Sequence, residues 1–64
     1  MDIEKALQLK VGDVVRFPPD RGSPGGFSKI RWIGPKTVHE NIHGKKYIWV
    51  TLHTGGVWPT NRLR

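Results

Sequence analysis

The residues of this sequence with the clearest binding chemistry are aromatic and basic, and several of them lie close together near the C-terminal end. The segment KKYIWVTLHTGGVWP contains Tyr47, Trp49 and Trp58 together with Lys45 and Lys46. Exposed aromatic rings stack on nucleobases, and neighbouring cations neutralise phosphates. The same rings can instead form cross-strand pairs or extend the core of a small domain, so their direction in the fold separates binding from packing.

The remaining polar residues do not form a pattern typical of catalysis or of metal binding. Asp13 and Asp20 have no paired carboxylate, and Ser23 and Ser28 have no histidine at a spacing typical of an activated nucleophile. The stretch GSPGG lacks the trailing Gly-Lys-Ser/Thr of a phosphate-binding loop. The absence of cysteine excludes a thiolate zinc site, and the three histidines are expected in solvated loops. We therefore predict a non-enzymatic protein without a metal or a cofactor.

Charge limits the classes of partner. Eleven Lys and Arg residues outnumber five Asp and Glu residues, which leaves a net charge of +6 on a chain of 64 residues. Such an excess favours polyanionic partners, although it can also serve solubility alone. No apolar run approaches the roughly 20 residues of a membrane span, and no hydrophobic signal segment opens the chain. We therefore expect an intracellular protein, cytoplasmic or nuclear, that does not associate with membranes.

Alternating apolar and polar residues predict an all-β domain. The expected antiparallel strands cover residues 12–17, 27–33, 36–40, 45–52 and 56–58. The segment PPDRGSPGG predicts a long first loop, while NIHG and HTGG predict tight turns. Pro59 opens a segment that suits a short 3-10 turn. Five short strands with this spacing predict an SH3-like barrel, or alternatively an open three-stranded meander with a flexible first loop.

We expect the barrel to span residues 9–64. The preceding residues 1–8 predict either a short helical turn with Asp2 as its N-cap or a frayed leader. The sequence contains no internal repeat and no low-complexity tract. A single domain of this length has to bury its apolar residues efficiently, because no disulfide can brace it.

A strand's period of two divides the predicted strands into a core face and an outer face. The expected core residues are Val11, Val15, Phe17, Ile30, Ile48, Val50, Leu52 and Val57. Trp32 shares the face of Ile30 in this pattern, whereas Ile33 falls on the opposite face. The outer face is then expected to carry Lys29, Arg31, Tyr47, Trp49 and Trp58.

Three short motifs, KVGDVVRF, RWIGPKTV and VWPTNRLR, resemble the C-terminal domain of retroviral and LTR-retrotransposon integrases of the gammaretrovirus and Ty3/gypsy kind. The resemblance covers residues 9–64. It implies an SH3-like barrel that binds DNA with little sequence preference and helps the enzyme to multimerise. The structural motif of that family is matched by Trp32, Gly34 and Pro35, and its basic positions are matched by Arg31 and Arg62.

The sequence also departs from each family that it resembles. Lys36 stands where the integrase domains usually place an aromatic residue. The stretch IRWIG resembles CAP-Gly domains, but their Gly-Lys-Asn-Asp-Gly groove motif is missing. The stretches GDVVR and PTNRL resemble the type II dihydrofolate reductases, whose Val-Gln-x-Tyr pore motif is absent. Enzyme activity of that kind is therefore not expected.

Charge, aromatic content and resemblance together predict a barrel that binds nucleic acid, most readily duplex DNA, without sequence specificity. The residues expected to contact it are Lys29, Arg31, Lys36, Lys45, Lys46, Tyr47, Trp49, Trp58 and Arg62. The alternative is a protein-interaction module, in which the Trp and Tyr side chains hold a peptide or a second copy of the chain. Salt-dependent binding separates the two, because only phosphate contacts release counterions.

Overall fold

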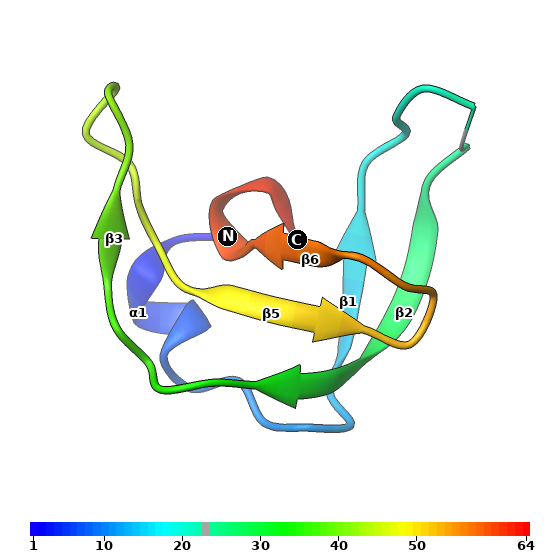
Figure 1. Cartoon of the computed structure of the whole chain (residues 1–64), viewed down its shortest axis with the longest axis horizontal. Coiled ribbons are helices and arrows are strands. Elements are labelled where there is room, and N and C mark those ends of the chain that lie inside the picture. The colour runs from blue at the N-terminus through cyan, green and yellow to red at the C-terminus, as the bar shows by residue number, and fades with distance from the viewer. Residues whose placement is uncertain (23) are drawn as a thin grey trace.

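The structure, a computed structural model, describes residues 1–22 and 24–64; Ser23, in the predicted first loop, lies outside the described residues. A short helix opens the chain and a 3-10 turn closes it (Figure 1). In chain order the elements are α1 (Ile3–Ala6), β1 (Val14–Phe17), β2 (Gly26–Ile33), β3 (His39–Glu40), β4 (Lys46–Tyr47), β5 (Trp49–Leu52), β6 (Val57–Pro59) and η1 (Thr60–Arg62). The fold is therefore all-β and antiparallel, as predicted.

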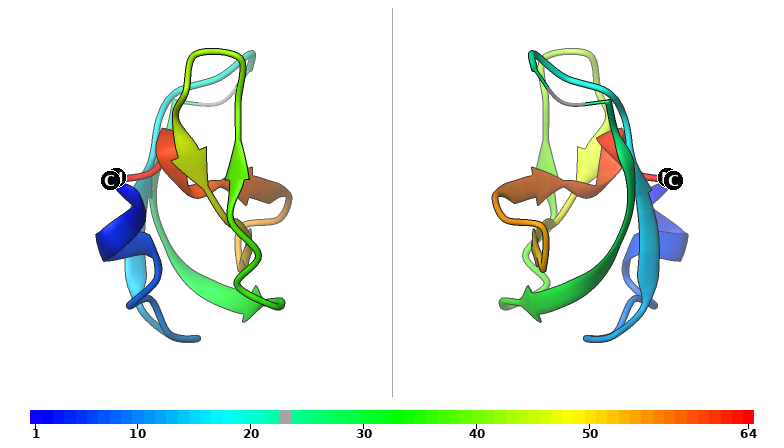
Figure 2. Two further views of the ribbon diagram at one scale, coloured as in Figure 1. Left: turned by 90° about the vertical axis from the view of Figure 1, so that its left-hand side faces the viewer. Right: turned by 90° about the vertical axis from the view of Figure 1, so that its right-hand side faces the viewer.

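The main sheet has the strand order β1-β2-β5-β6 and curls into a half-barrel (Figure 2). The curl follows from β2, which pairs with β1 through its first half and with β5 through its second half. A strand that changes partner along its length has to bend, and the right-handed twist of the strands adds to the curvature. A separate hairpin of β3 and β4 extends beside the sheet (Figure 1).

Three of the predicted strands differ from the structure by two residues or more or are interrupted, and the other two differ by one residue. The predicted strand 45–52 is divided at Ile48, which leaves the ladder and exchanges hydrogen bonds with Thr60 through its N–H (3.1 Å to Oγ1) and its carbonyl (3.0 Å). The predicted strand 36–40 starts only at His39, because the N–H of Thr37 turns back to the carbonyl of Pro35 (2.7 Å). The predicted strand 12–17 starts at Val14. The result is six strands in two sheets instead of five strands in one.

Both predicted tight turns are confirmed. In the turn after β3, the side-chain oxygen of Asn41 accepts hydrogen bonds from the N–H groups of His43 (2.9 Å) and Lys45 (3.0 Å). This arrangement is an Asx turn, which explains why asparagine opens the segment. In the turn after β5, the N–H of Gly55 donates to the carbonyl of Leu52 (3.0 Å). Short connections of this kind hold β3 against β4 and β5 against β6.

The core lies inside the curl of the sheet and contains most of the predicted residues. Val15, Ile30, Ile48, Val50 and Leu52 are buried, and Phe17 is partly buried against them. Sequence reasoning did not place three further residues there, which come from the two ends of the chain: Ala6, Leu9 and Leu63. The ends of the chain therefore complete a core that a half-barrel alone would leave open.

The prediction that Val57 faces the core and Trp58 faces outward was wrong. Val57 is 61% exposed, and Trp58 packs against the core. The pairing of β5 with β6 explains the reversal, because Trp58 lies opposite Val50 and therefore shares its buried face. Val11, also predicted inside, is exposed since it lies in the turn that precedes β1. A shift of one residue in register moves every side chain of a strand to the other face.

A β-bulge in β2 corrects a second prediction. Ile30 lies opposite Leu52 while Trp32 lies opposite Thr51, so Arg31 is an extra residue in the ladder. Beyond the bulge the faces are exchanged, which turns Trp32 outward and Ile33 inward against the core. The expected common face of Ile30 and Trp32 was therefore wrong, because a strict period of two fails at a bulge.

The two chain ends are tied to the body of the fold. The side chain of Asp2 accepts a hydrogen bond from the N–H of Lys5 (3.3 Å), which confirms the predicted N-cap and helical turn. At the other end, the N–H of Arg16 donates to the carbonyl of Arg64 (2.8 Å), and the N–H of Arg64 donates to the carbonyl of Arg16 (2.9 Å). These two bonds place the last residue beside the free edge of β1. Within residues 1–22 and 24–64, no helix has the length and apolarity needed to cross a bilayer.

Candidate functional site

Two exposed tryptophans line one shallow hollow on the outer face of the sheet, the face directed away from the core. Trp32 is 57% exposed and Trp49 is 42% exposed. The hollow between them has a volume of about 290 Å³ and is completed by Gly34, Pro35, Thr37 and His39. Single exposed apolar side chains are normal on soluble proteins, whereas exposed rings that share a concavity mark a candidate binding surface. We call this surface the tryptophan hollow.

The bulge and a glycine set the position of Trp32. The bulge turns the side chain outward, and the indole then folds back over Gly34. A Cβ atom at Gly34 would lie 2.5 Å from Cη2 of the indole, which is closer than real Cβ contacts allow. Glycine at this position therefore leaves room for the six-membered ring of the indole close to the backbone.

A row of three rings sets the position of Trp49. The imidazole of His39 stacks on Tyr47 with centroids 5.6 Å apart and an interplanar angle of 26°. Tyr47 in turn meets Trp49 edge-on at 5.3 Å and 88°. Offset-stacked and edge-to-face geometries are the favourable ones for aromatic pairs. The predicted outward direction of Tyr47 and Trp49 agrees with this arrangement, although Tyr47 is half-buried between its neighbours.

Trp58 and Arg62, which the sequence grouped with Trp49, belong to a different surface. Trp58 lies on the core side of the sheet, where its ring tilts against Phe17 with centroids 5.9 Å apart. The guanidinium carbon of Arg62 lies 5.3 Å from the centroid of Trp58 and covers the outer part of its ring. Trp58 is therefore mainly a packing residue, and only Arg62 of this pair is exposed.

The predicted basic residues are spread over several elements. Lys29 and Arg31 are exposed on β2, in the strand that also carries Trp32. Lys45 and Lys46 are exposed at the hairpin of β3 and β4, where Glu40 lies opposite Lys46. The ammonium group of Lys36 donates a hydrogen bond to the carbonyl of Leu7 and is directed toward the N-terminal segment.

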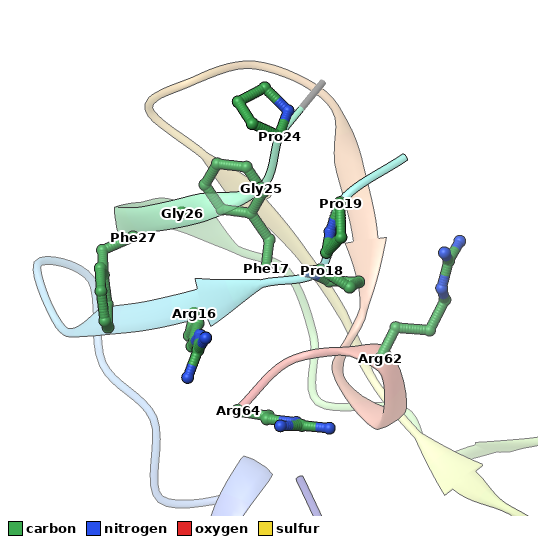
Figure 3. A pocket seen from close by; sticks show the side chains of 10 residues that line it. All are labelled: Arg16, Phe17, Pro18, Pro19, Pro24, Gly25, Gly26, Phe27, Arg62 and Arg64. Atoms are coloured by element: carbon green, nitrogen blue, oxygen red, sulfur yellow. The ribbon is translucent and has the colours of Figure 1, made fainter. Parts of the chain in front are cut away.

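A second hollow, which sequence reasoning missed, lies where the first loop meets the C-terminal end (Figure 3). It has a volume of about 270 Å³. Three arginines line it together with aromatic, proline and glycine residues: Arg16, Arg62, Arg64, Phe17, Phe27, Pro18, Pro19, Pro24, Gly25 and Gly26. The alternation in the sequence places Arg16 outward, but only the tertiary pairing of Arg16 with Arg64 could reveal the cluster. We call this surface the arginine hollow.

The described part of the chain shows no constellation for metal chemistry. Among its residues, no group of three or more His, Cys, Asp and Glu side chains is placed to hold a metal ion. His39 is stacked on Tyr47, while His43 and His53 are exposed in turns. The histidines therefore serve local structure or contact solvent.

No protein-family model, curated protein or solved structure matches this chain. The resemblance of its three short motifs to integrase C-terminal domains stays a prediction for that reason. An assignment of function consequently depends on the geometry and charge of the two hollows and on the outer face of the sheet.

Proposed function

We propose that this protein binds nucleic acid through the outer face of its main sheet. The observation that carries the proposal is the pair of exposed indoles, Trp32 and Trp49, which share one hollow on a chain of net charge +6. Stacking of a base on an aromatic side chain contributes roughly 1–3 kcal/mol in single-stranded complexes. Positive charge on the same molecule draws the phosphate backbone to it.

The basic residues nearest to Trp32 along the chain indicate the path that a bound nucleic-acid strand would follow. Arg31 precedes Trp32 in the bulge, and Lys29 lies two residues earlier on the outer face of the same strand. A nucleic-acid strand that places a base in the tryptophan hollow would therefore run along β2, with its phosphates at Arg31 and Lys29. Lys45 and Lys46 extend the basic surface at the hairpin of β3 and β4.

Exposed rings favour unpaired bases over a duplex. Bases within a duplex are stacked on one another, so an indole reaches their faces only after they unstack. The sequence alone favoured duplex DNA as partner, while the tryptophan hollow supports single strands. We therefore expect single-stranded DNA or RNA to bind more tightly than a duplex of the same sequence.

The SH3-like barrel and the likeness to integrase domains are part of this proposal. Three features support an SH3-like arrangement: a long connection between β1 and β2, a 3-10 turn after β6, and the hydrogen-bonded return of Arg64 to β1. If β4 and β5 are taken as one interrupted strand, the strands number five, and residues 63–64 follow them at the edge of β1. Small barrels of this size commonly use their outer surface for binding.

A salt titration tests the proposal. Tryptophan fluorescence is followed while single-stranded and duplex oligonucleotides of matched sequence are added at several salt concentrations. If about three to five phosphates are neutralised, log K falls against log[salt] with a slope of roughly −2 to −3.5 for single strands and −3 to −4.5 for duplex. Binding that does not respond to salt, or no quenching with either oligonucleotide, would contradict nucleic-acid binding.

A second function is supported by the lining of the tryptophan hollow. Its six lining residues include Trp32, Trp49 and Pro35 and, among the described residues, no Lys or Arg. Such an apolar lining suits a peptide side chain or a second copy of this chain as well as it suits a base. Dimerisation seen by analytical ultracentrifugation, or peptide binding that is insensitive to salt, would favour this function.

A further inference from the structure

Three arginines line the arginine hollow, one from β1 and two from the C-terminal end. Arg16 comes from β1, Arg62 from η1, and Arg64 follows that turn. In Figure 3 the side chains of Arg16 and Arg64 lie below β1, whereas that of Arg62 extends away from them. This cluster lies at the opposite end of β2 from the tryptophan hollow, because Gly26 and Phe27 line the one and Trp32 lines the other.

No carboxylate side chain neutralises this cluster in the part of the chain that the structure describes. None of the residues that line the hollow is acidic. In the same part of the chain, none of the three guanidinium groups donates a hydrogen bond to an Asp or Glu side chain. Like charges held close together repel one another and destabilise the fold. An anion in the hollow would remove that repulsion and supply the missing acceptors.

The arginines are held in place by contacts that leave their N–H groups available. The guanidinium carbon of Arg16 lies 5.8 Å from the centroid of Phe27, and that of Arg62 lies 5.3 Å from the centroid of Trp58. Stacking uses the face of the guanidinium plane, whereas the N–H donors project from its edge. The main-chain bonds between Arg16 and Arg64 fix where both side chains begin.

The wall formed by the first loop is close-packed where it borders the hollow. A Cβ atom added at Gly25 would lie 2.7 Å from the nitrogen of Pro19 and 2.9 Å from the carbonyl oxygen of Phe17. The two sides of the loop therefore touch through their backbones at this point. Prolines on both sides restrict the loop further, so the hollow exists before a ligand arrives.

From this arrangement we infer that the arginine hollow is a binding site for a phosphate group. The three arginines offer many N–H donors, and a phosphate group, which has more acceptor oxygens than a carboxylate, satisfies more of them. The ring of Phe27, which is 69% exposed, offers an apolar surface beside the site for the group that carries the phosphate. Two sources supply this chemistry, inorganic phosphate and the terminal phosphate of a nucleic-acid strand; the second source rests on the proposed function.

The first experiment uses inorganic phosphate as the probe. The backbone amide signals of Arg16, Phe27 and Arg64 are followed by NMR during titration with sodium phosphate, and sodium acetate at equal ionic strength serves as the planar comparison. We expect saturable shifts confined to residues around the hollow with phosphate and none with acetate. Shifts spread over all basic residues, or equal effects of acetate and phosphate, would overturn the inference.

Matched variants assign the binding to the arginines. Arg62→Gln and Arg64→Gln each remove one charged donor, and we expect about tenfold weaker phosphate binding from each. Arg21→Gln removes the same charge from the first loop, outside the lining of the hollow, and it should bind as the parent does. The main-chain bonds of Arg64 survive the substitution, and the NMR spectrum reports whether each variant is folded. Equal weakening in Arg21→Gln would show general screening and would refute the site.

A second experiment tests whether the terminal phosphate of a nucleic-acid strand binds in the arginine hollow. Two oligonucleotides that differ only in a 5′-terminal phosphate are compared by fluorescence titration of the parent and of Arg62→Gln. We expect the parent to bind the phosphorylated strand several-fold more tightly than the unphosphorylated strand. The Arg62→Gln variant should bind the two strands equally. If neither oligonucleotide binds while inorganic phosphate does, the proposed function fails and the arginine hollow stands. Tighter binding of an acidic peptide than of phosphate would refute the phosphate assignment.

Discussion

At the scale of single residues, the three tryptophans and Tyr47 divide into two exposed rings and two that pack against other side chains. Trp32 and Trp49 face solvent and line the tryptophan hollow, whereas Tyr47 supports Trp49 and Trp58 packs on the core. Removal of an exposed ring changes the free energy of unfolding little, whereas removal of a packed ring lowers it because the contacts of that ring are lost. Substitution of each ring therefore has a different expected consequence.

Trp49→Ala tests the binding role of the exposed ring. We expect a loss of roughly 1–3 kcal/mol in the free energy of nucleic-acid binding, because a stacking surface is removed. The free energy of unfolding should fall by about 1 kcal/mol, the contribution of the contact with Tyr47. Fluorescence anisotropy with a labelled oligonucleotide and urea denaturation measure the two quantities, and Trp49→Phe is the control that keeps a ring. A folded Trp49→Ala variant that binds as tightly as the parent would disprove the role.

Gly34→Ala tests the support of Trp32 without altering Trp32 itself. The added methyl group would lie 2.5 Å from Cη2 of the indole, so the ring has to move away from the backbone. We expect weaker binding by about 1 kcal/mol and little change in the free energy of unfolding, since the indole is exposed and can rotate. A double-mutant cycle with Trp32→Ala should show that the two effects are not additive. Additive effects would mean that Gly34 acts independently of Trp32.

At the scale of elements, register and irregularity decide which side chains reach which face. The bulge at Arg31 exchanges the faces of β2, and the break at Ile48 separates β4 from β5. The bulge turns Trp32 outward, and the break allows Tyr47 to pair with His39 while Trp49 remains in the main sheet. Both irregularities therefore help to assemble the tryptophan hollow.

Substitutions at Val57 and Trp58 test the register of β6. Val57→Ala should change the free energy of unfolding by no more than about 0.5 kcal/mol, because Val57 is 61% exposed. Trp58→Ala should lower it by about 3 kcal/mol, because the ring packs against the core and against Phe17. Urea denaturation of the two variants provides the comparison. The opposite order of the two effects would mean that the sequence-based assignment of these faces was right after all.

At the scale of the whole molecule, the proposed function requires that the net charge of +6 act through basic residues whose charge is exposed. Lys45 is exposed at the hairpin of β3 and β4, whereas the ammonium group of Lys36 is engaged by the carbonyl of Leu7. The two lysines carry the same charge and differ in where that charge is held. Substituting each lysine in turn therefore distinguishes a local phosphate contact from the long-range electrostatic field of the molecule.

Lys45→Ala should lower the magnitude of the salt slope by about one, the contribution of one phosphate contact. Lys36→Ala should change the slope less, because the side chain is directed toward the N-terminal segment. Both slopes come from titrations with the same oligonucleotide at several salt concentrations. Identical slopes for the two variants and the parent would show that neither lysine contacts a phosphate.

Local sequence patterns were enough to predict several features of the fold: alternation predicted the antiparallel strands, and turn and capping residues predicted two tight turns, a 3-10 turn and the N-cap at Asp2. Alternation also predicted which residues of β5 are buried, because Trp49–Leu52 keeps an unbroken pleat and a period of two applies there. The positions of Trp32, Val57 and Trp58 were decided by a bulge and by strand register, which depend on hydrogen bonds between segments distant in sequence. The arginine hollow depends on main-chain hydrogen bonds between Arg16 in β1 and Arg64. These residues are 48 positions apart in the sequence, so no local pattern predicts their contact.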